Sequence, residues 1–135
     1  MRVGSLISYS ALMLGASLVG PRVAHAQAAA PFKVDAMAAD RGKKIWNSKQ
    51  CYGCHELGHK QSTGPDLIGV TDRRNVEWLT KWLKDPTSMM DEDSTAMALQ
   101  KEFGSRMPKL GITTADANAL INYLAQQTQE KRGKM

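Results

Sequence analysis

The sequence is poor in cysteine, with only Cys51 and Cys54 among its 135 residues. A structural zinc site takes four ligands, and this chain has no second cysteine pair, so His55 and His59 would have to complete the site from the same turn. A thioredoxin-type redox pair belongs to a β-α-β pattern, and no alternating β-branched run precedes Cys51. Zinc binding and thiol redox chemistry therefore stay open only as minor alternatives.

Dense runs of basic charge are also lacking. Lys and Arg number 18 against 13 Asp and Glu, and the basic residues are scattered rather than interleaved with aromatic residues, which make up 6% of the chain. Nucleic acid is therefore not an expected partner. The formal net charge of +5 is compatible with docking to an acidic face of another protein, and equally with a solvated surface that keeps the chain soluble.

The N-terminal apolar run is short, because it covers only residues 6–20. A membrane-spanning helix needs about 20 apolar residues. Arg2 precedes the run and the small-x-small pattern of residues 24–26 follows it, which is typical of a secretory signal peptide. We predict a signal peptide over residues 1–26, cleaved before Gln27, and hence a periplasmic protein. Retention of this segment as a membrane anchor is the alternative.

The two cysteines stand in the segment CYGCH, in which His55 directly follows Cys54. C-x-x-C-H is the pattern for covalent attachment of haem. Two thiols three positions apart can each bond one vinyl group of the porphyrin, and the next residue can present its imidazole to the iron. The spacing therefore predicts one covalently bound haem c, attached through Cys51 and Cys54, with His55 as an iron ligand.

A second iron ligand is expected, because a stable electron carrier needs a donor on the other face of the iron. The candidates are Met89, Met90, Met97 and Met107. Met107 precedes Pro108 in a polar loop bounded by glycines, where a sulfur can be aimed, whereas Met97 has the helical spacing of a packing residue. We therefore favour Met107 as the second ligand.

Hydrophobic periodicity predicts helices and no strands, and hence an all-α fold. Four short helices are expected, covering about residues 35–49, 75–85, 94–103 and 114–127. They would pack around the haem, because a domain of this size buries only a modest core by itself.

Local signals mark several ends of these helices. Asn75 can cap the second helix, and Thr113 with Asp116 forms a capping box for the last. Pro86 is expected to terminate the second helix and Gly104 the third.

The chain accordingly divides into four parts. After the signal peptide, residues 27–34 form a linker, residues 35–127 form the haem-binding domain, and residues 128–135 form a flexible charged tail.

The residues and their order resemble the class I c-type cytochromes, which are small exported all-α electron carriers with the cytochrome c fold. The match spans about residues 35–127. Its landmarks, in chain order, are Gly42, Trp46, Cys51, Cys54, His55, Gly64, Pro65, Met107, Pro108 and Tyr123. The resemblance implies that Cys51 and Cys54 bind the haem, that His55 and Met107 are the iron ligands, and that Gly42 meets Tyr123 where the first and last helices cross.

The resemblance also implies roles for three further residues. Pro65 would offer its backbone carbonyl to the imidazole of His55 and so orient the ring. Arg73 would lie near a haem propionate, and the indole N–H of Trp78 or Trp82 would donate to it.

These observations predict a periplasmic monohaem cytochrome c of a respiratory chain, which shuttles single electrons between redox partner proteins and is not itself an enzyme. Lys49, Lys60 and Lys109 are expected near the haem edge, where they would steer an acidic partner. The mature form is expected to lack a transmembrane span. The alternatives are a haem-bearing subunit of a larger periplasmic oxidoreductase complex, and a haem sensor or peroxidase-like protein with an open iron position.

Overall fold

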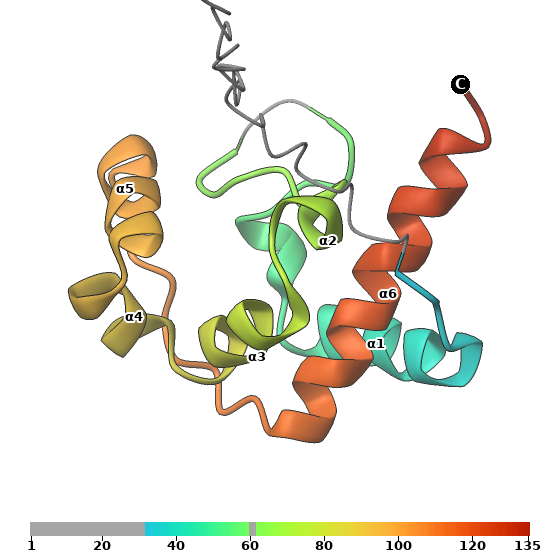
Figure 1. The fold of residues 1–135 in the computed structure, drawn as a ribbon, viewed down its shortest axis with the longest axis horizontal. Coiled ribbons are helices and arrows are strands. Elements are labelled where there is room, and N and C mark those ends of the chain that lie inside the picture. The colour runs from blue at the N-terminus through green and yellow to red at the C-terminus, as the bar shows by residue number, and fades with distance from the viewer. Residues whose placement is uncertain (1–31, 60–61) are drawn as a thin grey trace, which may run out of the picture.

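The computed structural model describes residues 32–59 and 62–135. The predicted signal peptide (1–26) and most of the predicted linker (27–34) lie outside these residues. The described residues form helices and no β-strand, which confirms the predicted all-α fold (Figure 1). No helix in this part of the chain combines the length and the apolar character that a membrane crossing requires.

The described elements follow one another along the chain as short helices and one long C-terminal helix (Figure 1). They are α1 (Ala36–Ser48), the 3-10 helix η1 (Cys51–Gly53), α2 (Val70–Arg73), α3 (Val76–Lys84), α4 (Pro86–Glu92), α5 (Ser94–Phe103) and α6 (Thr114–Arg132). The four predicted helices correspond to α1, α3, α5 and α6, whereas η1, α2 and α4 were not predicted.

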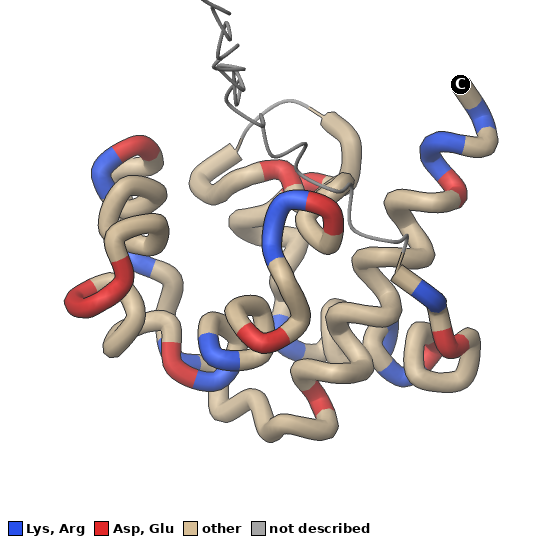
Figure 2. Tube along the Cα trace, in the orientation of Figure 1, with Lys and Arg blue, Asp and Glu red and all other residues tan. Residues whose placement is uncertain are grey.

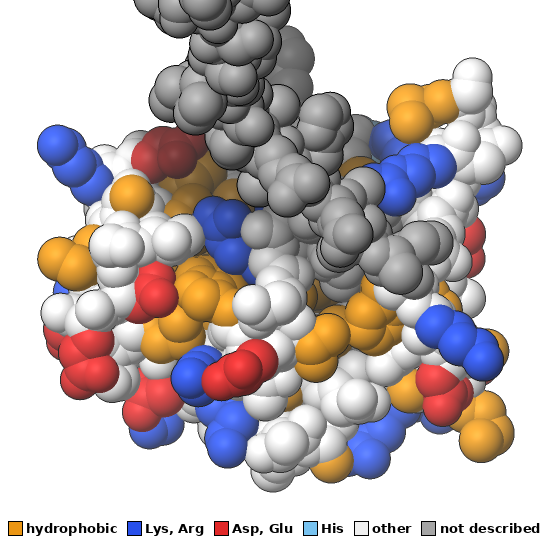
Figure 3. Space-filling view, in the orientation of Figure 1, with side chains coloured by type: hydrophobic (Ala, Val, Ile, Leu, Met, Phe, Trp, Pro, Cys, Tyr) orange, Lys and Arg blue, Asp and Glu red, His pale blue; other side chains and the backbone are white. Residues whose placement is uncertain are grey.

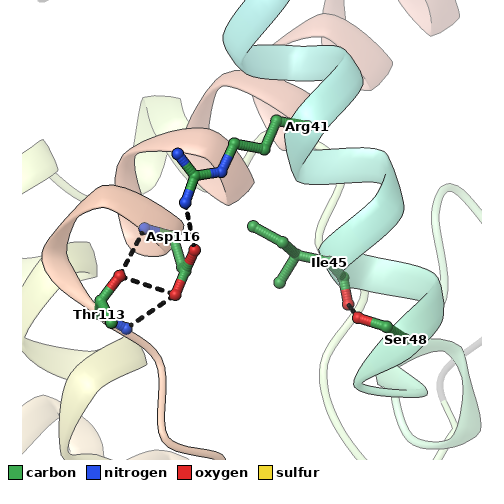
Figure 4. Close-up of polar contacts among 5 residues, drawn as sticks. All are labelled: Arg41, Ile45, Ser48, Thr113 and Asp116. Atoms are coloured by element: carbon green, nitrogen blue, oxygen red, sulfur yellow. Dashed lines mark hydrogen bonds and ion pairs between the residues drawn. The ribbon is translucent and has the colours of Figure 1, made fainter.

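Most of the predicted helix ends are confirmed. The Asn75 side chain accepts a hydrogen bond from the backbone N–H of Trp78 at the start of α3, and Gly104 ends α5 in a left-handed conformation with φ 64°. Thr113 and Asp116 form the expected capping box at the start of α6. The Asp116 carboxylate also pairs with Arg41 of α1 at 2.8 Å, which ties the first helix to the beginning of the last (Figure 4).

The predicted end of the second helix before Pro86 is confirmed, but helix α4, which follows it, was not predicted. Helix α3 does end at Lys84, but Pro86 begins a new helix, in which the Asp85 side chain accepts a hydrogen bond from the backbone N–H of Ser88. Proline is tolerated in the first turn of a helix, because the N–H it lacks would have no partner there. Asp85 thus closes one helix and caps the next.

The core centres on the crossing of α1 and α6. A Cβ placed on Gly42 would lie 2.1 Å from the backbone oxygen of Ala119 and 2.8 Å from the Cβ of Tyr123. Only glycine permits so close an approach of the two helices, and the contact of Gly42 with Tyr123 is the one that the resemblance implied. The rings of Trp46 and Tyr123 pack beside it, with their centroids 5.9 Å apart.

Helix α6 continues to Arg132, so the predicted helix end at Gln127 is wrong, and residues 128–132 of the predicted tail are helical. The hydroxyl of Thr128, which is 2% exposed, accepts a hydrogen bond from the backbone N–H of Gly69 at 2.9 Å. Lys131 donates to the backbone oxygen of Gly58 at 2.8 Å. These hydrogen bonds join the end of α6 to residues far earlier in the chain. The polar composition of residues 128–132 does not predict them.

Candidate functional site

Helix η1 places Cys51, Cys54 and His55 on one tight turn. Gln50 begins the turn in the left-handed region with φ 55°, and the backbone N–H groups of Cys54 and His55 donate to the Cys51 carbonyl at 3.2 and 3.0 Å. Cys51 is half-buried, Cys54 is exposed, and the two sulfurs are not joined to each other. One thiol thus faces the interior while the other stays at the surface.

The surroundings of the Cys51 thiol do not favour a redox or zinc site. Burial raises the pKa of the Cys51 thiol, whereas a reactive redox cysteine has a lowered pKa. Within residues 32–59 and 62–135, no three His, Cys, Asp or Glu side chains converge as a metal site. The two minor alternatives for the cysteine pair thus gain no support.

His55 is held by the segment Gly64-Pro65. Its Nδ1 lies 3.0 Å from the Pro65 backbone oxygen, which is the contact that the resemblance implied for Pro65. Because a carbonyl can only accept, this hydrogen bond places the proton on Nδ1 and leaves a lone pair on Nε2. Burial lowers the pKa of His55, although the hydrogen bond to Pro65 acts in the opposite direction. A neutral imidazole in this tautomer is suited to ligate a metal.

Gly64 is required by the same arrangement. A Cβ placed on Gly64 would lie 2.8 Å from Cε1 and 3.0 Å from Nδ1 of His55, and 3.1 Å from the backbone oxygen of Cys54. Glycine at this position therefore allows the ring to lie directly against the backbone.

An apolar cavity opens beside Cys51 and His55. About 870 Å³ of its space is not filled by protein atoms, and part of that space is open to solvent. The space-filling view shows hydrophobic side chains gathered in a hollow between α5 and the region of α2 and α3 (Figure 3). Among the lining residues are Trp46, Leu67, Val70, Leu79, Trp82, Leu83, Leu99, Leu120, Ile121 and Leu124. Large apolar walls next to the Cys51 thiol and an imidazole fit a covalently attached porphyrin, and the Cys54 thiol lines the neighbouring cavity.

Met107 lines this cavity together with His55, and no other methionine among the described residues does so. Met97 is 48% exposed on α5 and lines no cavity with His55, whereas Met90 is 3% exposed within α4 and does not line this cavity. Both His55 and Met107 also line a smaller neighbouring cavity, and there Met90 is a lining residue as well. The geometry thus brings Met107, and not Met97, to the same space as His55.

Arg73 lines the cavity while its guanidinium donates to two backbone oxygens, those of Ile68 at 2.7 Å and Asp66 at 3.0 Å. Arg74, which sequence reasoning did not single out, also lines the cavity. No sequence pattern distinguishes Arg74 from its neighbour, so the structure alone identifies it.

Trp78 differs from its expected role. Its indole N–H donates to Asp93 Oδ2 at 3.2 Å, so in this structure Trp78 is not free to donate to a propionate. Its ring stacks on that of Trp82, with centroids 5.4 Å apart and an interplanar angle of 8°, and the Arg74 guanidinium lies 5.4 Å above the ring. Both tryptophans still line the cavity and contribute apolar surface to its wall.

Two of the three lysines expected to steer a partner make contacts within the chain. Lys49 donates to the backbone oxygen of Leu110 at 2.8 Å, and Lys109 pairs with Asp85 at 2.6 Å. Lys60 lies outside the described residues. Acidic and basic residues are interspersed along the helices (Figure 2), so a docking role for these lysines stays a prediction.

Comparison with known proteins assigns this arrangement to a family. The family model described as cytochrome c matches residues 39–128. A solved cytochrome c from Rhodothermus marinus is 28% identical, with a TM-score of 0.68 over 73% of this chain and 83% of that one. The cytochrome c domain of the pp3183 protein from Pseudomonas putida is 34% identical, with a TM-score of 0.59 over 67% and 91%.

An engineered form of the Rhodothermus marinus protein, bound to a carbene intermediate, is 26% identical, with a TM-score of 0.65 over 76% of this chain and 88% of that one. No curated relative matches the chain.

Proposed function

The chain belongs to the cytochrome c family, and from this premise we propose that it is a periplasmic monohaem cytochrome c that carries single electrons between respiratory partners. Membership implies a covalently bound haem c, for which the chain offers the pair Cys51 and Cys54. We further propose that His55 and Met107 ligate the iron from opposite faces. The observation that carries this ligand set is the shared cavity of His55 and Met107, with His55 oriented by Pro65.

Each part of the pocket has a definite task in this proposal. Haem c, when bound, supplies an iron that cycles between two oxidation states one electron apart. The apolar lining excludes water, and Gly64 and Pro65 hold the His55 ring so that its Nε2 is presented. A thioether from Met107 would favour the reduced state more than a second imidazole, so a relatively high reduction potential is expected.

Electrons would enter and leave at the exposed side of the attachment turn. Tyr52 is 58% exposed and its neighbours Gly53 and Cys54 are also exposed, so a group bonded to this turn approaches the surface there. A partner could then come close without opening the fold. Export to the periplasm rests on the signal pattern of residues 1–26.

Substitution of Met107 tests the ligand set. Met107→Ala should keep the haem attached, lower the reduction potential and let carbon monoxide bind, because the sixth iron position would be open. Met97→Ala is the matched control, since Met97 lies outside the cavity, and it should behave as the wild-type protein. An unchanged potential in Met107→Ala, with no carbon monoxide binding, would assign the second ligand elsewhere.

The same measurements separate the alternatives. A wild-type protein that binds carbon monoxide rapidly would be the open-site sensor or peroxidase-like protein. A subunit of a larger oxidoreductase would elute from a size-exclusion column with its partners when purified without dissociation, whereas a free carrier would elute alone.

A further inference from the structure

Met107 stands in a segment that has no helix or strand of its own. Helix α5 ends at Phe103, with Gly104 as its cap, and α6 begins only after Thr113. Irregular segments are as a rule more mobile than the elements they join, whereas a metal ligand must be held within a fraction of an ångström to act. Something outside the segment therefore has to fix the position of the sulfur.

The residue before Met107 is anchored to α4. The Arg106 guanidinium pairs with Asp91 Oδ1 at 2.8 Å, lies 3.4 Å from the Thr87 backbone oxygen, and donates to Gln100 Oε1 at 3.1 Å. Three groups on α4 and α5 thus converge on one side chain, and a planar guanidinium can satisfy all of them at once.

The chain after Met107 is anchored to the other end of α4. Lys109 Nζ lies 2.6 Å from Asp85 Oδ2, and Asp85 is itself fixed because its other oxygen accepts the Ser88 backbone N–H that caps α4. The two carboxylates that hold the segment are therefore the residue at the N-terminus of α4 and one in its last turn.

Two hydrogen bonds to backbone oxygens complete the attachment. Ser105 donates to the backbone oxygen of Thr63 at 3.0 Å, next to the Gly64-Pro65 pair, and Lys49 at the end of α1 donates to the Leu110 oxygen at 2.8 Å.

We propose that the ion pairs Arg106–Asp91 and Lys109–Asp85 are positioning pairs, through which α4 holds the Met107 sulfur at the iron. This inference rests on the proposed His55 and Met107 ligation. It assigns a task to α4, one of the helices that the sequence did not predict. All four side chains are between 41% and 61% exposed, so each pair contributes modestly and is weakened by salt.

The predicted effect is therefore a shift in how often Met107 leaves the iron, not a loss of the fold. A surface pair shifts an equilibrium by about two- to fivefold. Loss of both pairs should make an added ligand, which must displace Met107, bind about four- to twenty-fivefold more tightly if the two free-energy effects add.

The experiment uses oxidised holoprotein and imidazole as the competing ligand. The test variant is Asp85→Asn with Asp91→Asn, because asparagine still caps a helix but removes the negative charge. The matched control is Asp72→Asn with Glu77→Gln, which has the same change in net charge and removes two exposed pairs, with Arg132 and Lys81, that do not touch the Met107 segment. Chemical unfolding of both variants confirms that each is folded.

The expected result is an about four- to twenty-fivefold lower dissociation constant for imidazole in the test variant, from the loss of two surface pairs, with a weaker methionine-to-iron charge-transfer band. In the control variant the dissociation constant for imidazole should change by less than about twofold, because only exposed charges away from the Met107 segment are lost. Raising the salt concentration should move the wild-type protein toward the test variant.

Equal dissociation constants in the test and control variants would overturn the inference. If the test variant gives no folded holoprotein, Asp91→Asn alone is compared with Asp72→Asn, since it leaves the cap of α4 intact. Absence of the methionine-to-iron band in the wild-type protein would instead overturn the proposed ligand set, so the two failures are distinguishable.

Discussion

The substitution Gly64→Ala tests whether the backbone beneath the His55 ring holds the imidazole in place. Gly64 is buried and its φ is not positive, so alanine can adopt the backbone conformation and the effect is purely one of space. The added methyl would lie 2.8 Å from His55 Cε1 and 3.1 Å from the Cys54 oxygen. Neither neighbour moves freely, because one belongs to the backbone and the other is hydrogen-bonded to Pro65.

The magnitude follows from two opposing effects. Replacing glycine by alanine in a compatible conformation would stabilise the protein by about 0.4–1 kcal/mol through the unfolded chain. Overpacking a tight site costs about 1–3 kcal/mol. The steric cost is the larger, so the free energy of unfolding should fall by about 1–2 kcal/mol, which lowers the melting temperature of a domain of this size by about 5–15 °C.

The assay is chemical unfolding of the holoprotein, followed by haem absorbance. Gly133→Ala is the control, because its Cβ would meet only the Gln129 and Glu130 backbone oxygens, at an ordinary 3.6 and 3.8 Å, and its φ is −68°. This variant should change the unfolding free energy by less than about 0.5 kcal/mol. If Gly64→Ala were as stable as the wild-type protein, the claim that this glycine is required by the ring would be wrong.

Two further predictions concern α6. Thr128→Val should lower the unfolding free energy by about 1–3 kcal/mol, measured by chemical unfolding, because the buried Gly69 N–H loses its acceptor. Asp116→Asn should destabilise the protein at neutral pH but not in strong acid, measured as melting temperature against pH. The Thr113 hydroxyl and backbone N–H, with Arg41, hold the pKa of Asp116 below its ordinary value of 3.8, so its stabilising effect is present above that value and is lost as the pH falls through the folded pKa.

A separate result would contradict each of these two predictions, and Thr128→Val has a matched control variant. Thr80→Val removes a hydroxyl that bonds only within α3, and it should cost far less than Thr128→Val; equal costs would mean that the contact of Thr128 with Gly69 contributes nothing. For Asp116→Asn, a difference from the wild-type protein that stays constant down to strong acid would contradict the role of the charged carboxylate.

The features that could be predicted from the sequence depend on neighbouring residues. Asn75, Gly104 and the pair Thr113 and Asp116 act within one helical turn, so their residue types alone indicate where a helix begins or ends. The contact of Gly64-Pro65 with His55 could be predicted only through the resemblance. Local residue types do not indicate it, because His55 lies nine residues before Gly64 in a different local structure.

The features that could not be predicted depend on distant partners. Pro86 can end one helix or begin another, and the sequence does not show which. The continuation of α6 past Gln127 depends on Gly58 and Gly69, which lie about 60–70 residues away. The Trp78 indole N–H donates to Asp93 because of how α3 packs against the helices that follow it. No local sequence pattern predicts this hydrogen bond.

The most direct test of the central claim is the mass of the intact exported protein, produced in a host that attaches haem to C-x-x-C-H sequences and unfolded before measurement. We expect one species with the mass of residues 27–135 plus one haem, because Cys51 and Cys54 would hold the group covalently. A mature protein with the mass of its amino acids alone would contradict the account.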